Sequence, residues 1–456
     1  MPTLMNLHET LRALRGPARA AVVAVALGGA LAACDVDSLL QVPDPDVATP
    51  ESVQDPAALP AVRAGAIGDL AIAIAGSNTT EDGMVQYTGL LTDELNWAET
   101  FPTREQIDRR NIEVINGTME GLFSLVQRAR ASAERAADGY TRLAPDAPQR
   151  GEAYALAGFS YIIIAEAYCS GVPFSHITST GTQEFGEPQT TVEMFDRAIQ
   201  LFDSALAAPG INATFTNLAK VGKGRALLNL ARYTEAAAAV NGVPTSFVYN
   251  LEYSENSNRQ NNGVYIVNHV NRRFSPIGSE GGNGLPYRND NDPRVVAPRG
   301  TGSQTVGFDG ATPLFLNQKY PSRSAAFPLA TGIEARLIEA ESQLQTDPVA
   351  ALATLNALRT APGTAGSGGV AGLTPLTPQV TTAAQVDQLF KERAYWLWLT
   401  SHRIGDLRRL SRPTTAVAGH PAGYNRDPES VWPTGTFFKG GAYGPDTNFP
   451  VPFSEK

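Results

Sequence analysis

Histidine, cysteine and acidic residues could do chemistry in this chain, but they do not fall at the spacings that catalysis or metal binding needs. The sequence has no HExxH, paired CxxC, GxSxG or P-loop motif, and no GxGxxG turn after a strand. Asp290 and Asp292 in "NDNDPRV" offer the oxygen ligands that calcium prefers, yet the rest of a calcium-binding loop is missing, which favours a turn. The histidines are scattered: His8, His176, His269, His402 and His420. We therefore expect no catalytic residues, no metal and no cofactor.

Two other reactive groups are also explained without catalysis. Asp93 with Glu94, and Glu339 with Glu341, could serve as the carboxylate pair of a hydrolase, but neighbours on a helix are more typical of a solvated face. Cys169 lies in "AEAYCSGVPF" with no matching histidine or aspartate nearby, so we expect a buried structural thiol rather than a nucleophile. The chain is predicted not to be an enzyme.

Aromatic residues in irregular segments are the strongest sign of a binding surface. They alternate with Asn, Asp and Arg, and flat rings stack on the apolar faces of sugars or cover a peptide while amides and carboxylates bind hydroxyls. The alternative interpretation is that each ring only packs a long loop against the protein body. The residues concerned are Trp97, Tyr249, Tyr253, Tyr265, Tyr287, Tyr424 and Trp432.

Five residues form the predicted ligand site. Trp97 follows "LLTDELN" and precedes a proline, so we expect it where a helix gives way to a loop and where a ring can stay exposed. Asn96 beside it offers both donor and acceptor groups. Tyr265, Tyr287 and Trp432 complete the predicted set for glycan or peptide capture. If Trp97 is instead a buried anchor, its removal would destabilise the fold.

The N-terminus has the order of a secretory signal, with a basic region, an apolar run and small residues before a cysteine. The run from 20 to 33 is about fourteen residues, shorter than the roughly twenty that a spanning helix needs. "LAAC", Leu31–Cys34, resembles a bacterial lipobox; the alternative is an ordinary signal peptide that ends near a cysteine. We predict a signal peptide over 1–33, acylation of Cys34 and a Pro/Asp-rich spacer over 34–53. The basic region holds Arg12, Arg15 and Arg19.

The charge of the chain argues against nucleic acid as a partner. The whole sequence has 36 Lys and Arg against 45 Asp and Glu, a net charge of −9. Without residues 1–33, which hold three basic residues and one acidic residue, 33 face 44 and the net charge is −11. An acidic chain with no basic cluster has little attraction for phosphate backbones.

Helical periodicity dominates two parts of the sequence, about 54–240 and 331–412. Small and apolar residues recur at helical spacing in "GEAYALAGFSYIIIAEAY" and "TVEMFDRAIQLFDSAL". Further patterns run over Pro56–Ala75, Arg104–Asp138 and Ala383–Leu410, which brings the expected number of helices to about eight or nine. The fold is predicted to be mainly α with little β structure.

Local signals support helical hairpins of the tetratricopeptide type. Gly224 and Ala236 stand twelve apart around "LARYTEA", where small residues let two helices approach closely. Thr190 with Glu193 is the pattern of a capping box. In "DPVAALATLNALR", Asp347 can cap a helix that begins at Pro348.

Two long segments, about 241–330 and 413–456, are rich in turns and aromatics and are expected to face the ligand. The first contains one run typical of a strand, "GVYIVNHV". Loops of this length are usually functional or disordered, and their aromatic content argues against disorder.

The chain resembles the SusD/RagB family of outer-membrane nutrient-binding lipoproteins over nearly the whole of residues 54–456. No single motif is decisive, but their order is specific. Besides the lipobox, the resemblance rests on "LLTDELNWAETFPTREQIDRRNI", "AYALAGFSYIIIAEAYCSGVPFS", "NDPRV", "ATGIEARLIEAES", "KERAYWLWLTSHRIGDLRRL" and "YGPDTNFPVP".

One segment departs from the family pattern. The late helix of the family commonly reads like "ERxxELWxEGxRxxDLxR", whereas here Trp396, Thr400 and Ser401 replace the usual Glu, Glu and Gly. This change affects the expected local packing. One helical face of the segment is predicted to be a structural seam, formed by Leu389, Arg393, Trp396, Arg403, Leu407 and Leu410.

The resemblance implies a single helical domain that lies as a lid on a SusC-like TonB-dependent transporter and delivers glycans or peptides to it. It also implies an outer-membrane location, at the cell surface, through acyl chains on Cys34. The family often places an early-loop tryptophan in its binding arc, which makes Trp97 the best candidate here. The alternatives are a helical-repeat scaffold that binds only proteins and, less favoured, a lipid-anchored hydrolase; the aromatic loops and the missing catalytic motifs argue against them.

Overall fold

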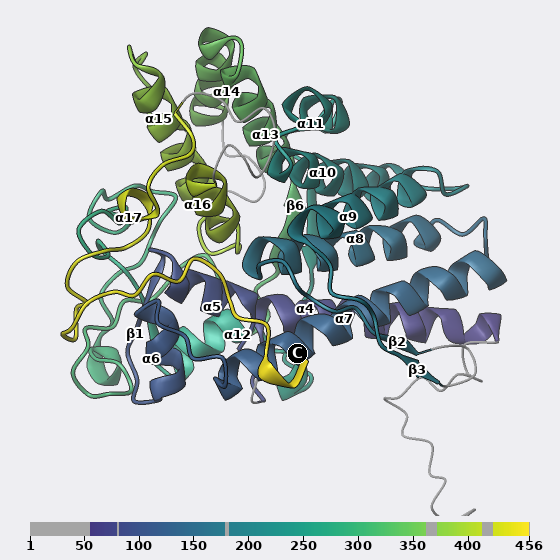
Figure 1. Cartoon of the computed structure of the whole chain (residues 1–456), viewed down its shortest axis with the longest axis horizontal. Helices are drawn as coiled ribbons and strands as arrows, with labels where there is room; N and C mark the ends of the chain where they lie inside the picture. Colours follow the sequence, from purple (N-terminus) through teal and green to yellow (C-terminus); the bar gives the residue numbers. More distant parts are fainter. Residues whose placement is uncertain (1–54, 80–81, 178–181, 362–371, 413–422, 456) are drawn as a thin grey trace, which may run out of the picture. The chain divides into compact units, whose positions relative to one another are not determined.

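The computed structural model describes residues 55–79, 82–177, 182–361, 372–412 and 423–455. All of these belong to one compact unit, Pro50–Lys456. Within them α-helices dominate, and the short strands pair only in twos, so the predicted mainly helical fold class is confirmed (Figure 1). The signal peptide, Cys34 and the spacer fall outside the described residues and stay predictions, as do the proposed domain limits.

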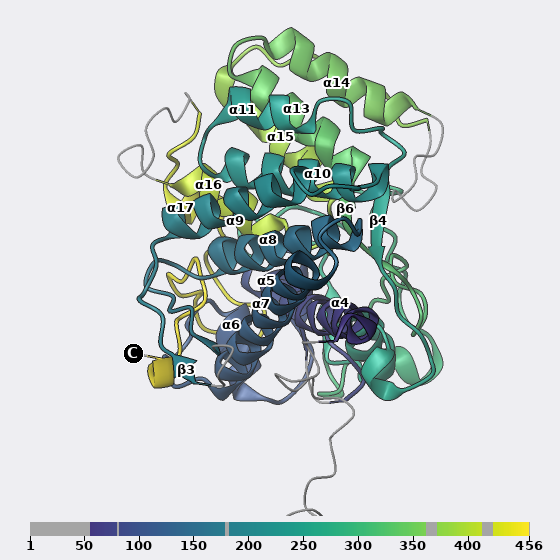
Figure 2. The ribbon, with the colours of Figure 1, turned by 90° about the vertical axis from the view of Figure 1, so that its right-hand side faces the viewer.

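Consecutive helices pack side by side through most of the helical part (Figure 2). Each helix from α7 to α11 contacts the next one along the chain, and α13 contacts both α11 and α14, as in helical-repeat proteins. The helices are α4 (Leu59–Ala75), α7 (Gly117–Leu143), α8 (Gln149–Ala167), α9 (Thr191–Leu206), α10 (Ala213–Asn229), α11 (Tyr233–Val240), α13 (Gly332–Leu344) and α14 (Pro348–Thr360).

Glycines allow the closest of these contacts. A Cβ atom on Gly224 would lie 2.5 Å from Cγ1 of Val240 and 3.4 Å from the carbonyl oxygen of Ala236, so the predicted close approach of α10 and α11 is confirmed. The ring of Phe202 sits against two further glycines, where a Cβ would lie 2.7 Å (Gly158) and 2.3 Å (Gly222) from its Cζ atom. These distances leave no room for a side chain.

The predicted helix starts are also confirmed. The Thr190 hydroxyl accepts from the Glu193 amide at 3.2 Å, and the Glu193 carboxylate accepts from the Thr190 amide at 2.7 Å. At the start of α14 the Asp347 carboxylate accepts two backbone N–H groups, and Pro348 is the first helical residue. Each cap satisfies amides that the helix itself cannot pair.

Helix α4, together with the helical turn Pro56–Ala58 before it, is the one helical run among the described residues that is long and apolar enough to cross a membrane, with mean hydropathy 1.5 over its most apolar window. A core helix has the same composition, and α4 packs against α7, α8 and α5 (Met84–Leu91). We therefore interpret α4 as part of the protein core.

Two expected helices are interrupted. In place of one helix over 104–138, α6 (Pro102–Asp108) ends and α7 starts afresh with Asn116 as its cap. The late segment divides into α15 (Thr382–Trp396) and α16 (Arg403–Ser411), because Leu399 and Ser401 between them adopt left-handed backbone angles, with φ of +53° and +63°. The six residues predicted as a seam are all buried, so the seam is confirmed although the single helix is wrong.

The strand predicted for "GVYIVNHV" is wrong. Its residues form a helical turn, α12 (Gly263–Tyr265), followed by a π-type turn over Ile266–Val270. The side chain of Asn262 accepts from the Tyr265 amide at 3.1 Å and so starts the helix. Val264 and Val267 are buried at a helical spacing of three, which the alternation of large residues in the sequence obscured.

The expectation that the acidic pairs face solvent is wrong for Asp93, Glu94 and Glu341, which are at most 1% exposed. Arginines of α16 turn inward and pair with two of them: Arg403 donates to both Asp93 oxygens at 2.7 Å, and Arg409 to both Glu341 oxygens at 3.1 and 2.9 Å. These carboxylates tie α16 to α13 and to the turn after α5.

The expected burial of Cys169 is also wrong. Helix α8 ends two residues before it, and the side chain emerges exposed, with Nδ2 of Asn448 3.2 Å from its sulfur. The chain turns outward at this point, so periodicity within α8 does not carry over to Cys169.

Candidate functional site

A two-stranded pair positions a cavity in the loop-rich part. Strand β1 (Leu95–Trp97) runs antiparallel to β5 (Phe274–Pro276), and Asn96 lies opposite Ser275. Leu95 and Trp97 face the core, which turns Asn96 to the other side. The cavity of about 400 Å³ beside this pair is lined by Asn96, Ile277, Gly278, Ser279, Glu280, Gly281, Arg288, Asn289, Thr436, Phe438 and Tyr443.

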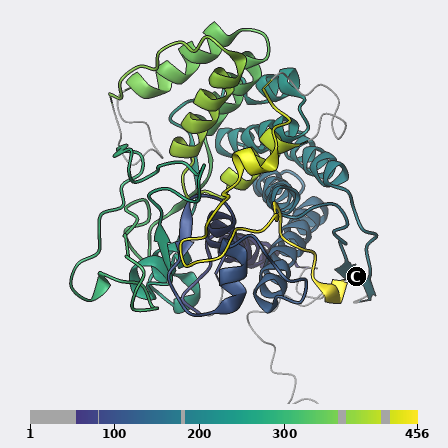
Figure 3. The same ribbon diagram turned by 60° about the vertical axis from the view of Figure 1, so that its left-hand side comes forward.

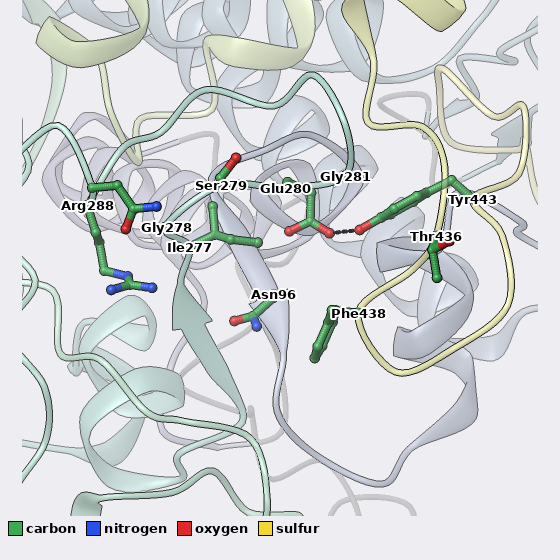
Figure 4. Close-up of a pocket in the computed structure, with 11 residues that line it drawn as sticks. Asn96, Ile277, Gly278, Ser279, Glu280, Gly281, Arg288, Thr436, Phe438 and Tyr443 are labelled. Carbon is green, nitrogen blue, oxygen red and sulfur yellow. Dashed lines mark hydrogen bonds between the residues drawn. The ribbon is translucent and has the colours of Figure 1, made fainter.

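The lining residues come from segments that are far apart in the sequence. Figure 3 shows the C-terminal segment approaching the loops that follow β5, and the Gly282 amide donates to the carbonyl oxygen of Thr434 at 3.0 Å. In Figure 4, Arg288 lies at one end of the cavity and Phe438 and Tyr443 lie at the other, with Glu280 between them. No local sequence pattern could place these residues together.

A tight turn presents Phe438 at the surface. The Phe437 amide donates to Gly441 at 2.9 Å, and the Gly440 amide donates back to Phe437 at 2.8 Å. Gly440 and Gly441 have φ of +97° and +82°, a conformation that residues with a Cβ rarely adopt. Phe437 is buried while Phe438 is 43% exposed, so the turn offers one aromatic face to the cavity.

Arg110 holds both ends of the segment that carries this turn. Its Nε donates to the carbonyl oxygen of Asp446 at 2.8 Å, and its Nη1 donates to that of Pro433 at 2.5 Å. The guanidinium also stacks on Trp432, 5.2 Å from the ring centroid, and burial lowers the pKa of Arg110 to about 10. The clamp fixes Phe438 and Tyr443 relative to β1.

Glu280 is a buried carboxyl group in the cavity wall. It is 1% exposed, one of its oxygens accepts from the hydroxyl of Tyr443, and Oε2 has no partner among the described residues. Burial raises the pKa of Glu280 well above its ordinary value, and the nearby carboxyls of Asp108 and Asp93 raise it further. The raised pKa favours the protonated form of Glu280, which can donate a hydrogen bond.

The expectation that Trp97 stays exposed is wrong, since it is 7% exposed. Its amide donates to Asp108 at 2.7 Å, and Nζ of Lys439 lies 3.8 Å from its ring centroid, held there by a 2.6 Å ion pair with Asp309. Pairing of β1 with β5 turns this side chain into the core. Trp97 therefore supports the wall from behind and offers no open face.

The other predicted site residues lie in different surroundings. Trp432 and Tyr287 are fully buried, and Tyr287 stacks on Tyr395 at 5.2 Å, so neither offers a ring to a ligand. Tyr265 is half-buried and stacks on His269 at 4.6 Å, away from the residues that line the cavity. Of the five predicted residues, Asn96 is the one that lines the cavity, and its binding role stays a prediction.

Sequence reasoning missed Phe438, Tyr443, Glu280 and Arg288. The first two carry a readable signal, because "TFFKGGAYG" places two glycines between aromatic residues, which is typical of a tight turn with exposed rings. The other two carry no such signal, since their roles depend on which segments meet.

The segment "NDNDPRV" forms the turn that was expected. Asp290 accepts from Lys391 at 2.6 Å and from Tyr395 at 2.7 Å, and Asp292 pairs with Arg294 at 2.7 Å. These partners engage Oδ2 of Asp290 and both carboxylate oxygens of Asp292. Within the described part of the chain, no group of three or more His, Cys, Asp or Glu side chains could hold a metal.

Comparison with known proteins places the fold but matches no sequence family. No family model and no curated protein matches the chain. Solved structures do match: a SusD superfamily protein from Bacteroides vulgatus has a TM-score of 0.59 at 12% identity, over 88% of this chain and 97% of that one.

Two further structures agree with this result. A SusD-like carbohydrate binding protein from Bacteroides fragilis has a TM-score of 0.59 at 14% identity, over 89% of this chain and 98% of that one. A laminarin binding SusD-like protein has a TM-score of 0.54 at 15% identity, over 88% and 97%. The chain therefore has the SusD fold, as the resemblance implied.

Proposed function

We propose that this protein captures glycans at the cell surface and delivers them to a SusC-like TonB-dependent transporter, while acyl chains on Cys34 hold it in the outer membrane. The observation that supports this proposal most is the cavity beside β1 and β5, which combines the exposed ring of Phe438 with amide, hydroxyl and guanidinium groups inside a SusD fold. Two structures of the same fold are described as carbohydrate or laminarin binding.

The chemistry of the cavity suits a saccharide. A ring such as Phe438 stacks on the apolar face of a sugar, and the side chains of Asn96, Ser279 and Thr436 can exchange hydrogen bonds with hydroxyl groups. The volume of about 400 Å³ lies within the range of small-ligand sites, roughly 300–1,000 Å³, and suits one or two sugar rings. A peptide is the alternative ligand class.

The proposal includes binding without turnover. Glycoside hydrolysis generally requires two carboxyl groups on either side of the scissile bond. Among the described residues that line the cavity, Glu280 is the single carboxyl group, and its Oε1 is engaged by Tyr443. A ligand should therefore leave the protein with its chain length unchanged.

A panel of polysaccharides and peptides tests the ligand class. The purified exported chain should be retarded in gels that contain at least one glycan, and chromatography of that glycan after incubation should show no shorter products. Retardation by peptides alone, or release of products that a single carboxyl substitution abolishes, would contradict the proposal.

Cell fractionation tests the anchor. Cys34→Ser protein should move from the outer membrane to the soluble exported fraction, because acyl chains on Cys34 provide the proposed attachment. The measurement is made in cells that lack the transporter, since a transporter complex could also retain the protein. A variant that stays in washed membranes of such cells would contradict the anchor.

A further inference from the structure

Arg288 is a cation without an anionic partner at one end of the cavity. Its Nε donates to the carbonyl oxygen of Pro276 at 3.0 Å, and its Cζ lies 3.3 Å from the ring centroid of Phe315. Neither terminal nitrogen has a hydrogen-bond partner among the described residues, and no carboxylate there pairs with Arg288. The guanidinium is thus held in place while its terminal N–H groups stay available.

The surroundings of Arg288 make this end of the cavity electropositive. Arg299 shares the ring of Phe315, with its Cζ 5.4 Å from the centroid. Burial and the charge of Arg299 both lower the pKa of Arg288, although it stays far above neutral pH as an arginine. Two arginines on one ring without a carboxylate are unexpected in a chain with net charge −9.

The helical part shows that this arrangement is not general. The buried arginines Arg393, Arg403 and Arg409 each pair with at least one carboxylate. Arg408 has no carboxylate partner, but its Nη1 donates to three backbone carbonyl oxygens. Arg288 differs from these arginines because neither of its terminal nitrogens has a hydrogen-bond partner among the described residues.

The rest of the cavity does not cancel the positive charge. Glu280, the carboxyl group in its wall, lies between the two ends in Figure 4 and is buried against Tyr443. Asn289 and Ser279 are uncharged and exposed near Arg288. A negatively charged group that entered from solvent would meet two terminal nitrogens with free N–H groups and no opposing carboxylate on this side.

We propose that Arg288 binds the carboxylate of an acidic sugar, so that the ligands of this protein are glycans that contain uronic acids. A planar guanidinium matches a carboxylate with two parallel hydrogen bonds, and stacking on Phe315 fixes its plane before the ligand arrives. Phe438, at the other end, is placed to stack on a neighbouring sugar ring. This inference rests on the proposed glycan-binding function and names its ligand class.

Calorimetry on matched pairs of oligosaccharides tests this assignment. The probes are four-residue oligogalacturonate, oligoglucuronate and oligomannuronate, each beside its carboxyl-reduced neutral form, with neutral laminari-oligosaccharides and tetraglutamate as further arms. At least one acid should bind tenfold or more tightly than its reduced form. Arg288→Gln should abolish that preference, Arg288→Lys should restore it only in part because lysine lacks the planar fork, and Arg299→Gln should change affinity less than threefold.

The outcomes separate this inference from the proposed function. If neutral saccharides bind as tightly as acidic ones, or if a preference for acid survives Arg288→Gln in a variant with an unchanged melting temperature, the uronate assignment fails and glycan binding stands. If tetraglutamate binds and no saccharide does, both fail. If the Arg288→Gln protein does not fold, the test uses Arg288→Lys, which keeps the charge. Unchanged affinity of Arg288→Lys for the acidic saccharide would then overturn the uronate assignment.

Discussion

Buried carboxylates in the helical seam and beside the cavity differ in how their oxygens are satisfied. In the seam, Asp406 accepts from Arg393 and Arg409, and both of its oxygens are bonded. Beside the cavity, Asp108 and Glu280 each have one bonded oxygen, and neither pairs with an arginine among the described residues.

This difference distinguishes the buried charges that stabilise the fold from those that remain available to a ligand. Flanking arginines lower the pKa of Asp406 and favour its ionised form, whereas burial raises the pKa of Asp108 and of Glu280 and favours their protonated forms. A fully paired carboxylate has no capacity left for a ligand. In the cavity wall, the free oxygen of Glu280 and the unpaired Arg288 are the groups that remain available to a ligand.

Breaking the seam should have the largest effect. Asp406→Asn removes the charge between two buried arginines and should lower the free energy of unfolding by about 3–5 kcal/mol, because Arg393 and Arg409 each lose one carboxylate partner in the protein interior and keep only Glu341. Urea unfolding measures this loss. The control is Asp387→Asn at an exposed ion pair with Arg426, where about 1 kcal/mol or less is expected. Equal effects of the two substitutions would contradict the distinction.

Trp97 tests whether the wall of the cavity is structural. Because its ring is 7% exposed and packed behind Asn96, Trp97→Ala should lower the free energy of unfolding by about 3 kcal/mol or more. The measurement is again urea unfolding, with ligand affinity recorded on the folded fraction. A stable variant with lost affinity would restore the sequence-based view of Trp97 as a direct ligand contact.

The pH dependence of stability should have opposite signs at Glu280 and Asp406. The raised pKa of folded Glu280 means that the folded state holds this proton more tightly than the unfolded chain, whose carboxyl has its ordinary pKa of about 4.5. The unfolded state therefore binds fewer protons, and stability should fall as pH rises from about 5. Glu280→Gln should remove this part of the slope, up to about 1.4 kcal/mol per pH unit. Asp406 acts in reverse, and its contribution is lost as pH falls below about 4.

Unfolding of the parent and the Glu280→Gln protein at pH 5, 6.5 and 8 measures the difference. Glu94 and Glu99, with pKa values raised to about 8 and about 7 mainly by burial, add slopes of the same sign to both proteins, so only the difference between the two proteins reports on Glu280. A difference that does not change with pH would show that Glu280 is ionised in the folded state.

Local features of the fold were readable from the sequence because local rules determine them. Helix caps at Thr190 and Asp347 and the glycine contact at Gly224 follow from residues within one or two turns. The seam face was also found, although two left-handed residues divide its helix. "GVYIVNHV" was misread because a run of large apolar residues fits a strand and a buried turn equally well.

The site was mostly not readable, since it depends on long-range contacts. Trp97 and Trp432 were expected at the surface from their irregular flanks, but strand pairing and the Arg110 clamp bury them. Conversely, Arg288 and Glu280 acquire meaning only when the loop after β5 meets the C-terminal segment. Such contacts leave no periodic trace in the sequence.

The smallest expected effect concerns the break in the seam. Ser401 has φ of +63° where the related pattern has glycine, so Ser401→Gly should relieve roughly 1 kcal/mol of backbone strain. The variant loses the 3.1 Å hydrogen bond between Ser401 and the Thr88 hydroxyl, although that hydroxyl still donates to the carbonyl oxygen of Met84. We therefore expect a net gain of about 0.5 kcal/mol in the free energy of unfolding. Thermal unfolding measures it. Leu399→Gly is the control, because its buried side chain makes the same change destabilising.

The affinity of the Phe438→Ala protein tests the central claim most directly, because Phe438 is 43% exposed in the cavity and meets the core through an edge-to-face contact with Phe437. With the tightest glycan from the panel, calorimetry should show a loss of about thirtyfold, equivalent to roughly 2 kcal/mol, at an unchanged melting temperature. Phe185→Ala, at a phenylalanine that is 83% exposed outside the cavity, should bind like the parent. Parent-like affinity of Phe438→Ala, or an equal loss in Phe185→Ala, would contradict the cavity as the glycan site.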